Sequence, residues 1–291
     1  MKRLVALLLF FFSFSFAKPN VIATYPWIGD LVREVGKDRV NLYVIAKGSE
    51  DPHFVVPKPS HIARMRNADL LIMQGASLEI GFLPPLLQQS NNPKIQPGSE
   101  GLLDLSQFVK IIEKPEGVSR AMGDIHPEGN PHYQLDPHNI PILARAITDK
   151  LCQIDEKNCT YYKGNLENFL TRWDTKLKGW DRDFEKLKGI KVIEYHKLYD
   201  YLIRRYGMVL VGTLEPLPGI PPTAKHVEEL LTNSKDVKFI LQDVYHERRT
   251  AQYVAQKLNA KLVVLPHDVG AVPEARDIFS LFDEIVRRLN Q

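Results

Sequence analysis

The sequence predicts an α/β protein in which a single long helix joins two lobes, each built on a parallel sheet. Two observations predict this fold class. Short β-branched runs alternate with amphipathic segments in both halves of the chain, and a long amphipathic stretch without proline separates the halves. Strand, helix, strand, helix in succession is typical of a parallel sheet with helices on both faces. The length of 291 residues suits two domains of about 150 residues each.

The first half of the chain begins with a strand and helix alternation. Strand-like runs lie at 21–24, 40–45 and 68–73. The first helical pattern has apolar residues at helical spacing from Trp27 to Val35 and ends at Gly36. A second helix is expected from about Ser60, which is a good N-cap residue. A long polar loop is expected from about Glu113 to Asn139.

The second half follows a long amphipathic helix. Between about Asn158 and Lys188, apolar residues recur at steps of three and four, which predicts one continuous helix. Strands are expected after it at 191–193, 208–212, 239–241 and 262–265. We therefore expect an N-terminal lobe at 18–157, a linking helix at 158–188 and a C-terminal lobe at 189–291.

The first 17 residues predict a secretory signal peptide. Two basic residues precede an apolar run of about ten residues, and Ser15 and Ala17 occupy the −3 and −1 positions. The alternative, a membrane anchor, needs about 20 apolar residues, and this run gives way to Lys18 too early. No cysteine follows the run to carry a lipid. We expect cleavage after Ala17 and export of the mature chain to the periplasm.

The composition is that of an ordinary globular protein, with 44% apolar and 25% charged residues. Of the 38 Lys and Arg residues, Lys2 and Arg3 lie in the predicted signal peptide, which leaves 36 basic against 35 acidic residues. This balance gives no indication of a nucleic-acid partner. Cys152 and Cys159 predict one disulfide in an oxidising compartment. Two free thiols are the alternative, and their spacing is too wide for a zinc knuckle.

The histidines are the candidate chemical groups. Motifs of zincin proteases, serine hydrolases and nucleotide-binding loops are all missing from the sequence. His53, His196 and His267 follow expected strands, and His132 lies in the long polar loop. Open α/β sheets bind ligands at the carboxyl ends of their strands. Imidazoles that converge there from two lobes suit Zn²⁺, which takes three or four nitrogen ligands.

The segments around these histidines resemble the metal-binding solute-binding proteins of bacterial zinc and manganese ABC importers. The resemblance covers nearly all of the mature chain, and its main motifs are Asp51-Pro52-His53, Asn130-Pro131-His132-Tyr133-Gln134-Leu135-Asp136-Pro137, Tyr195-His196-Lys197 and Glu215-Pro216-Leu217-Pro218-Gly219. It implies two (β/α) lobes, a rigid linking helix, a buried metal at the lobe interface and delivery of that metal to a membrane permease.

Three ligand positions carry over from the family to His53, His132 and His196. Members that resemble manganese carriers place a carboxylate at the third position. His196 instead completes a set of three imidazoles, which favours Zn²⁺ over the harder Mn²⁺. The ligand set does not by itself exclude Cu²⁺ or Ni²⁺.

The fourth family position departs from the pattern. Family members have an aspartate three residues before a glycine, and counting back from Gly270 gives His267. Three alternatives stay open: His267 replaces the carboxylate, a small shift brings in Asp268, or water fills the position.

Other residues have two interpretations each. Glu215 either accepts a hydrogen bond from a ligand imidazole, as metal sites usually require, or stabilises a turn. His126 lies where relatives carry a histidine-rich acidic tract and either gathers metal or is an ordinary loop residue. The remaining histidines are expected to be surface or helix-capping groups: His61, His138, His226 and His246.

The resemblance implies a periplasmic zinc-binding component of an ABC importer, not an enzyme. Its transported ligand is Zn²⁺, with Mn²⁺ as the alternative, and its partners are a permease and the cytoplasmic ATPase. The chain is expected to be a monomer. Two further hypotheses are an exported zinc hydrolase, for which Glu215 is the only candidate base, and a cell-surface adhesin or scaffold.

Overall fold

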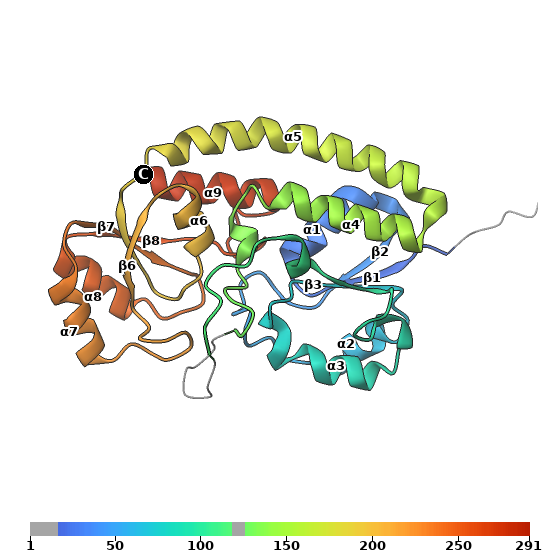
Figure 1. Ribbon diagram of the computed structural model, residues 1–291, viewed down its shortest axis with the longest axis horizontal. Helices are drawn as coiled ribbons and strands as arrows, with labels where there is room; N and C mark the ends of the chain where they lie inside the picture. The colour runs from blue at the N-terminus through green and yellow to red at the C-terminus, as the bar shows by residue number, and fades with distance from the viewer. Residues whose placement is uncertain (1–16, 118–125) are drawn as a thin grey trace, which may run out of the picture.

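The computed structural model describes residues 17–117 and 126–291. It has two lobes, each built on a four-stranded parallel sheet, and the long helix α5, Cys159–Glu185, runs above both lobes (Figure 1). The predicted fold class is therefore confirmed. Apart from Ala17, the predicted signal peptide lies outside the described residues. Within the described part, no helix is both long and apolar enough to cross a membrane.

The N-terminal sheet has the strand order β2-β1-β3-β4, and all its pairings are parallel. Its strands are β1 Asn20–Ala23, β2 Asn41–Val44, β3 Leu70–Met73 and β4 Leu102–Asp104. The helices of this part of the chain are α1 Pro26–Gly36, α2 Pro59–Met65, α3 Leu83–Ser90 and α4 Ile140–Ile154.

The C-terminal sheet repeats this arrangement with the order β6-β5-β7-β8. Its strands are β5 Lys191–Glu194, β6 Val209–Thr213, β7 Val237–Gln242 and β8 Lys261–Val264. Its helices are α6 Asp200–Arg205, α7 Ala224–Asn233, α8 Arg249–Leu258 and α9 Ile278–Asn290. In both sheets the order reverses between the first and third strands, which is where open sheets bind ligands.

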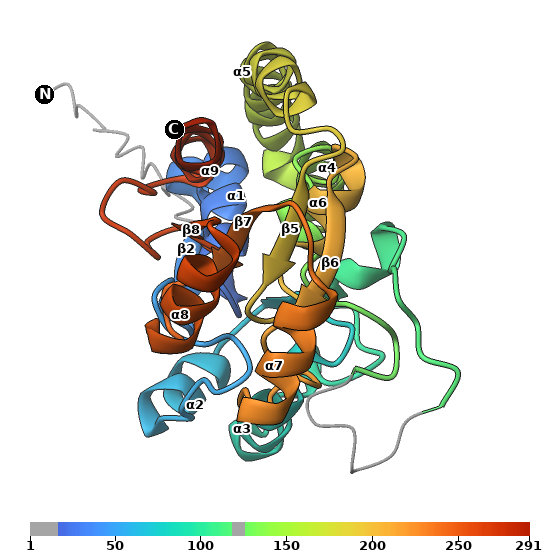
Figure 2. The same ribbon diagram turned by 90° about the vertical axis from the view of Figure 1, so that its left-hand side faces the viewer.

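Helix α9 packs alongside α5, which the sequence pattern did not predict. Trp173 and Trp180 of α5 contact Phe282 of α9, with ring centroids 5.6 Å and 5.3 Å apart. Helix α9 also contacts α1 of the N-terminal lobe. Figure 2 shows α5 and α9 at one end of the molecule and α2 and α3 toward the other. The C-terminal helix α9 therefore contacts both the linking helix α5 and the N-terminal lobe.

The lobes do not have fully separate hydrophobic cores. One buried cluster extends from the N-terminal sheet through α4, α5 and α9 to Val192, Leu241 and Val263 of the C-terminal sheet. A smaller cluster lies between the C-terminal sheet and helices α7 and α8. Only this outer cluster belongs to the C-terminal lobe alone, because α9 brings apolar side chains of the C-terminal segment onto the N-terminal lobe.

Polar contacts also join the lobes close to the loop that carries His53. Asp268 accepts a hydrogen bond from the backbone N–H of Trp27 at 2.7 Å. Gly48 lies so close to the other lobe that a Cβ there would be 1.9 Å from the carbonyl oxygen of Val269. A side chain at position 48 would therefore separate the lobes.

The predicted disulfide is confirmed. Cys152 is bonded to Cys159, which ties the end of α4 to the start of α5. This places the covalent link at the N-terminal end of the linking helix.

Candidate metal centre

Three of the four sequence-predicted ligands meet between the lobes. His53 follows β2, His132 lies between β4 and α4, and His196 follows β5. One ring nitrogen from each lies within 4.8 Å of those of the other two. The ring centroids are 5.3 Å apart for His53 and His132, 5.0 Å for His53 and His196, and 5.7 Å for His132 and His196. Such a group can converge on one tetrahedral ion.

The nitrogen atoms of this group lack protein partners where a metal would bind. Among the described residues, His53 Nε2 and both ring nitrogens of His132 are buried without a hydrogen-bond partner. Buried polar atoms are normally paired, and an unpaired one costs about 1 to 3 kcal/mol. His53 and His132 therefore present lone pairs that a cation would satisfy.

A carboxylate from the same loop orients His53. Asp51 Oδ1 lies 2.9 Å from His53 Nδ1 and accepts the His53 backbone N–H at the same distance. Burial raises the pKa of Asp51, but its hydrogen bonds with His53 and the nearby imidazoles together outweigh burial, and the pKa lies below its usual range. The hydroxyl of Tyr25 holds the loop by donating to the carbonyl of Pro52 at 2.8 Å. An ionised Asp51 accepts the Nδ1 proton, so Nε2 is free for a metal.

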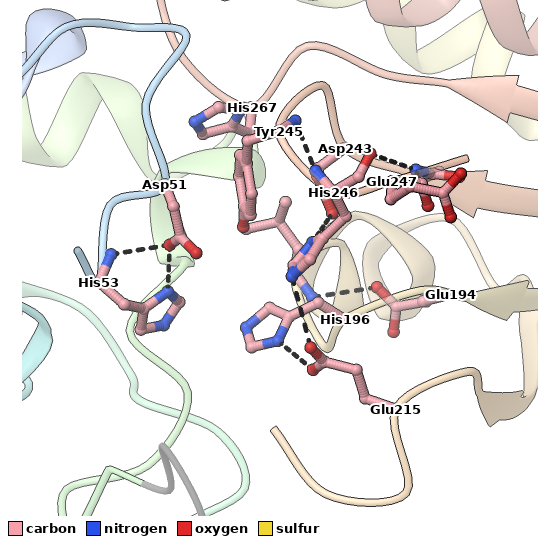
Figure 3. A network of polar contacts seen from close by, with 12 residues as sticks. Asp51, His53, Glu194, His196, Glu215, Asp243, Tyr245, His246, Glu247 and His267 are labelled. Carbon is pink, nitrogen blue, oxygen red and sulfur yellow. Dashed lines mark hydrogen bonds and ion pairs between the residues drawn. The ribbon is translucent and has the colours of Figure 1, made fainter. Parts of the chain in front are cut away.

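A chain of three side chains, Glu215, His246 and Asp243, orients His196 (Figure 3). Glu215 Oε2 lies 2.7 Å from His196 Nδ1, and Glu215 Oε1 lies 3.4 Å from His246 Nε2. His246 Nδ1 in turn lies 2.7 Å from Asp243 Oδ2. Burial raises the pKa of Glu215, but its contacts with His196 and His246 lower it to about 2. Of the two interpretations of Glu215, the structure shows the contact with the ligand imidazole.

The prediction that His246 is a surface or capping group is wrong. Burial alone would lower the pKa of His246, but Asp243 and Glu215 together raise it to about 9. The sequence offered a weak signal for this role, since Asp243 directly follows β7 and lies three residues before His246. A positive His246 keeps Glu215 ionised beside His196.

We expect the His246 contact to make stability depend on pH. The native state holds an extra proton between pH 6.5, the free histidine value, and about 9. The contacts of protonated His246 with Asp243 and Glu215 stabilise the native state. This stabilisation is fully present below pH 6.5 and is lost as pH rises through 9. After a discount for solvent screening, the wild type should lose about 1 to 2 kcal/mol relative to His246→Gln across this range. Urea unfolding of both metal-free proteins at pH 6.5 and 9.5 measures the difference, and parallel profiles would contradict it.

Within the described part of the chain, the ring nitrogens of His132 have no hydrogen-bond partner, and the residue is positioned through its backbone. Asn130 Oδ1 accepts the His132 N–H at 3.0 Å, and Gln74 Nε2 donates to the carbonyl of Pro131 at 2.5 Å. Burial, and then the neighbouring His53 and His196, lower the pKa of His132 well below its usual value. The ring is therefore neutral, which is the form that binds metals.

The structure does not bring His267 or Asp268 into the group. His267 is buried, with Nε2 3.2 Å from the carbonyl of Glu50 and Nδ1 unpartnered among the described residues. Asp268 binds the backbone N–H groups of Trp27 and Val269. The assignment of His267 as fourth ligand stays a prediction.

His126 lies beside the group without joining it. Its ring stacks on that of His53 with centroids 5.3 Å apart, and its buried Nε2 has no hydrogen-bond partner in the described part of the chain. His126, His132 and His196 line a cavity of about 260 Å³. His53 and His126 line a second cavity of about 670 Å³.

The other three histidines are not part of the site. His61 accepts the backbone N–H of Lys58 and so caps α2. His226 Nε2 lies 2.8 Å from the carbonyl of Thr213, near the start of α7. His138 does not cap a helix, because its Nε2 lies 2.8 Å from Asp181 of α5 instead.

Comparison with known proteins identifies the family. The family model described as "Zinc-uptake complex component A periplasmic" matches residues 21–291. This chain belongs to that family. Its members are metal-binding transport proteins and not enzymes, so the expectation that the chain is not an enzyme is confirmed. Both oxygens of Glu215, the only candidate base, contact protein groups.

Individual relatives differ in their metal. The chain is 24% identical over 268 residues to the high-affinity zinc uptake system protein ZnuA of Bacillus subtilis, covering 89% of this chain and 82% of ZnuA. It is 25% identical over 248 residues to the manganese ABC transporter substrate-binding lipoprotein PsaA of Streptococcus pneumoniae, covering 79% and 74%.

A solved structure shares the fold. The Mn-bound periplasmic metal-binding protein from Candidatus Liberibacter asiaticus superimposes with a TM-score of 0.78 at 19% identity, over 94% of this chain and 98% of that one. Zinc and manganese proteins are both similar to this chain, so the comparisons leave the metal open.

Proposed function

We propose that this protein is the periplasmic zinc-binding component of an ABC importer, which binds one Zn²⁺ between its lobes and delivers it to the permease. One observation carries the choice of metal. Three possible metal ligands converge between the lobes, and they are the imidazoles of His53, His132 and His196. Among the described residues, no carboxylate belongs to this group. Imidazole suits Zn²⁺, whereas Mn²⁺ prefers carboxylate and carbonyl oxygens.

The carboxylates near the site support the same choice. Asp51 and Glu215 each bind the Nδ1 side of a ligand histidine, and Asp268 binds backbone N–H groups. Each therefore orients a ligand or a loop. Water is the simplest fourth ligand in this arrangement, since Zn²⁺ sites with three protein ligands keep a fourth position for it.

Manganese is the alternative cargo, since the manganese protein PsaA is as similar to this chain as the zinc protein ZnuA is. For Mn²⁺ to be the cargo, a carboxylate such as Asp51 would have to leave its histidine and turn toward the metal. The partners we propose are the same in either case: a membrane permease with its cytoplasmic ATPase. We also propose export to the periplasm with cleavage after Ala17, and a monomeric protein.

Zinc uptake by cells tests the transport role. A strain that lacks this protein should grow poorly in chelator-treated medium, and radioactive zinc uptake should return when the wild-type chain is expressed. The same chain with His196→Ala should not restore it. Full rescue by His196→Ala, or rescue by manganese alone, would contradict the proposal.

A further inference from the structure

Asn130 connects the two segments that carry His132 and His196, across the lobe boundary. Its side-chain Oδ1 accepts the backbone N–H of His132 at 3.0 Å. Its Nδ2 donates across the lobe boundary to the carbonyl of Lys197 at 3.0 Å and to Asp200 Oδ2 at 3.2 Å. One carboxamide therefore binds the backbone of His132 and the residue that follows His196.

The backbone of Asn130 is fixed as firmly as its side chain. Its carbonyl accepts the hydroxyl proton of Tyr201, on α6, at 2.7 Å, and its N–H donates to the carbonyl of Ile112 at 2.9 Å. The Tyr201 oxygen also accepts the N–H of Ile112 at 3.1 Å. Asn130 is only 8% exposed, so these bonds lie in a largely dry environment where they are strong.

The three imidazoles differ in how they are held. Asp51 contacts the ring of His53 and Glu215 contacts the ring of His196, whereas neither ring nitrogen of His132 has a partner among the described residues. The position of His132 therefore depends on the backbone bonds around it. The N-terminal lobe contributes the bond from Gln74 to the carbonyl of Pro131. The C-terminal lobe is bonded through the side chain of Asn130.

We propose that Asn130 is a positioning residue that fixes His132 relative to His196, so that these two imidazoles form a preset pair across the lobe boundary. This rests on the proposed function, because it assigns a role within that metal site. Without the amide, the loop of His132 loses its bonds to Lys197 and Asp200 beside His196, and the metal would have to order the pair itself. Loss of groups that orient metal ligands typically costs about 10-fold to 100-fold in affinity.

Two substitutions at Asn130 test the cross-lobe role. Asn130→Ala removes all the side-chain bonds, whereas Asn130→Asp keeps an acceptor for the His132 N–H and removes the two donors to the C-terminal lobe. We expect both variants to bind Zn²⁺ about 10-fold to 100-fold more weakly in competition with a chelator, with faster dissociation. If Asn130→Asp binds like the wild type while Asn130→Ala does not, the amide only supports its own loop and the inference is wrong.

Asn139→Ala is the matched control. Asn139 Nδ2 donates to the carbonyl of Tyr133 at 2.9 Å, so it supports the turn after His132 entirely within its own loop. We expect this variant to keep its zinc affinity within about twofold, and equal losses at Asn130 and Asn139 would contradict the inference.

Thermal unfolding of the metal-free variants detects any that fail to fold, and the Co²⁺ absorption spectrum reports the geometry of the bound site. The spectrum should change in the Asn130 variants and not in Asn139→Ala. A wild-type protein that binds no zinc would instead contradict the proposed function. Failure of the proposed function can therefore be told apart from failure of the inference about Asn130.

Discussion

Replacing His53, His132 or His196 by alanine is expected to weaken zinc binding by more than about 100-fold in each case. Loss of a group that only orients a ligand already costs about 10-fold to 100-fold, and these residues supply the ligand atoms themselves. Calorimetric titration of each metal-free variant with Zn²⁺, using a competing chelator for the tight wild type, gives the affinities.

The metal-free fold should survive these three substitutions. His53 and His132 each line a cavity and carry ring nitrogens without a hydrogen-bond partner among the described residues, so alanine there removes few protein hydrogen bonds. His138→Ala is the control, because it removes an imidazole whose Nε2 contacts Asp181 of α5, outside the metal group. We expect it to bind zinc like the wild type. Wild-type affinity in any of the three ligand variants would remove that residue from the site.

Glu215→Gln is expected to have the second largest effect, a loss of about 10-fold to 100-fold in zinc affinity. Glu215 accepts the Nδ1 proton of His196, which leaves Nε2 for the metal and makes it a better donor. A neutral amide holds this proton more weakly and leaves the charge of His246 without its partner Glu215.

Glu247→Gln provides the matched control for this substitution. Glu247 belongs to the same loop as His246, but its carboxylate accepts the backbone N–H of Arg249 and is exposed. The same titration should show wild-type affinity for this variant. If Glu215→Gln and Glu247→Gln both bind zinc normally, Glu215 has the turn-stabilising role that the sequence left open.

The sequence predicted the fold and three converging histidines because both depend on local signals. The strands and α5 follow from periodicity, and His53 and His196 follow from their position after strands β2 and β5. Parallel sheets place such positions at one edge, so the order of elements alone brought these side chains near each other. The motif around His132 added the residue that periodicity could not place.

The parts that the sequence did not predict depend on contacts between distant segments. His246 and Asp243 reach Glu215 only because β7 lies beside β5 in the sheet. Helix α9 crosses back onto α5 through the aromatic contact of Phe282 with Trp173, and amphipathic spacing does not say which helix will cover an apolar face. Asn130 likewise binds residues almost 70 positions away, at Lys197 and Asp200.

The arrangement of helices bears on how the metal leaves. A shared core and two bridging helices, α5 and α9, resist wide separation of the lobes. Release therefore requires movement of the loops that carry the ligands. The ring of His53 is held by a carboxylate of its own loop, whereas the segments of His132 and His196 are joined through Asn130.

The metal held by the mature protein tests the central claim most directly. Protein purified without a chelator or affinity tag should contain about one zinc per chain by elemental mass spectrometry. In calorimetric competition, the metal-free form should take up Zn²⁺ in preference to Mn²⁺, as three imidazoles require. A preference for Mn²⁺ would mean that a carboxylate completes the site, and a protein that binds neither metal would contradict a metal centre at His53, His132 and His196.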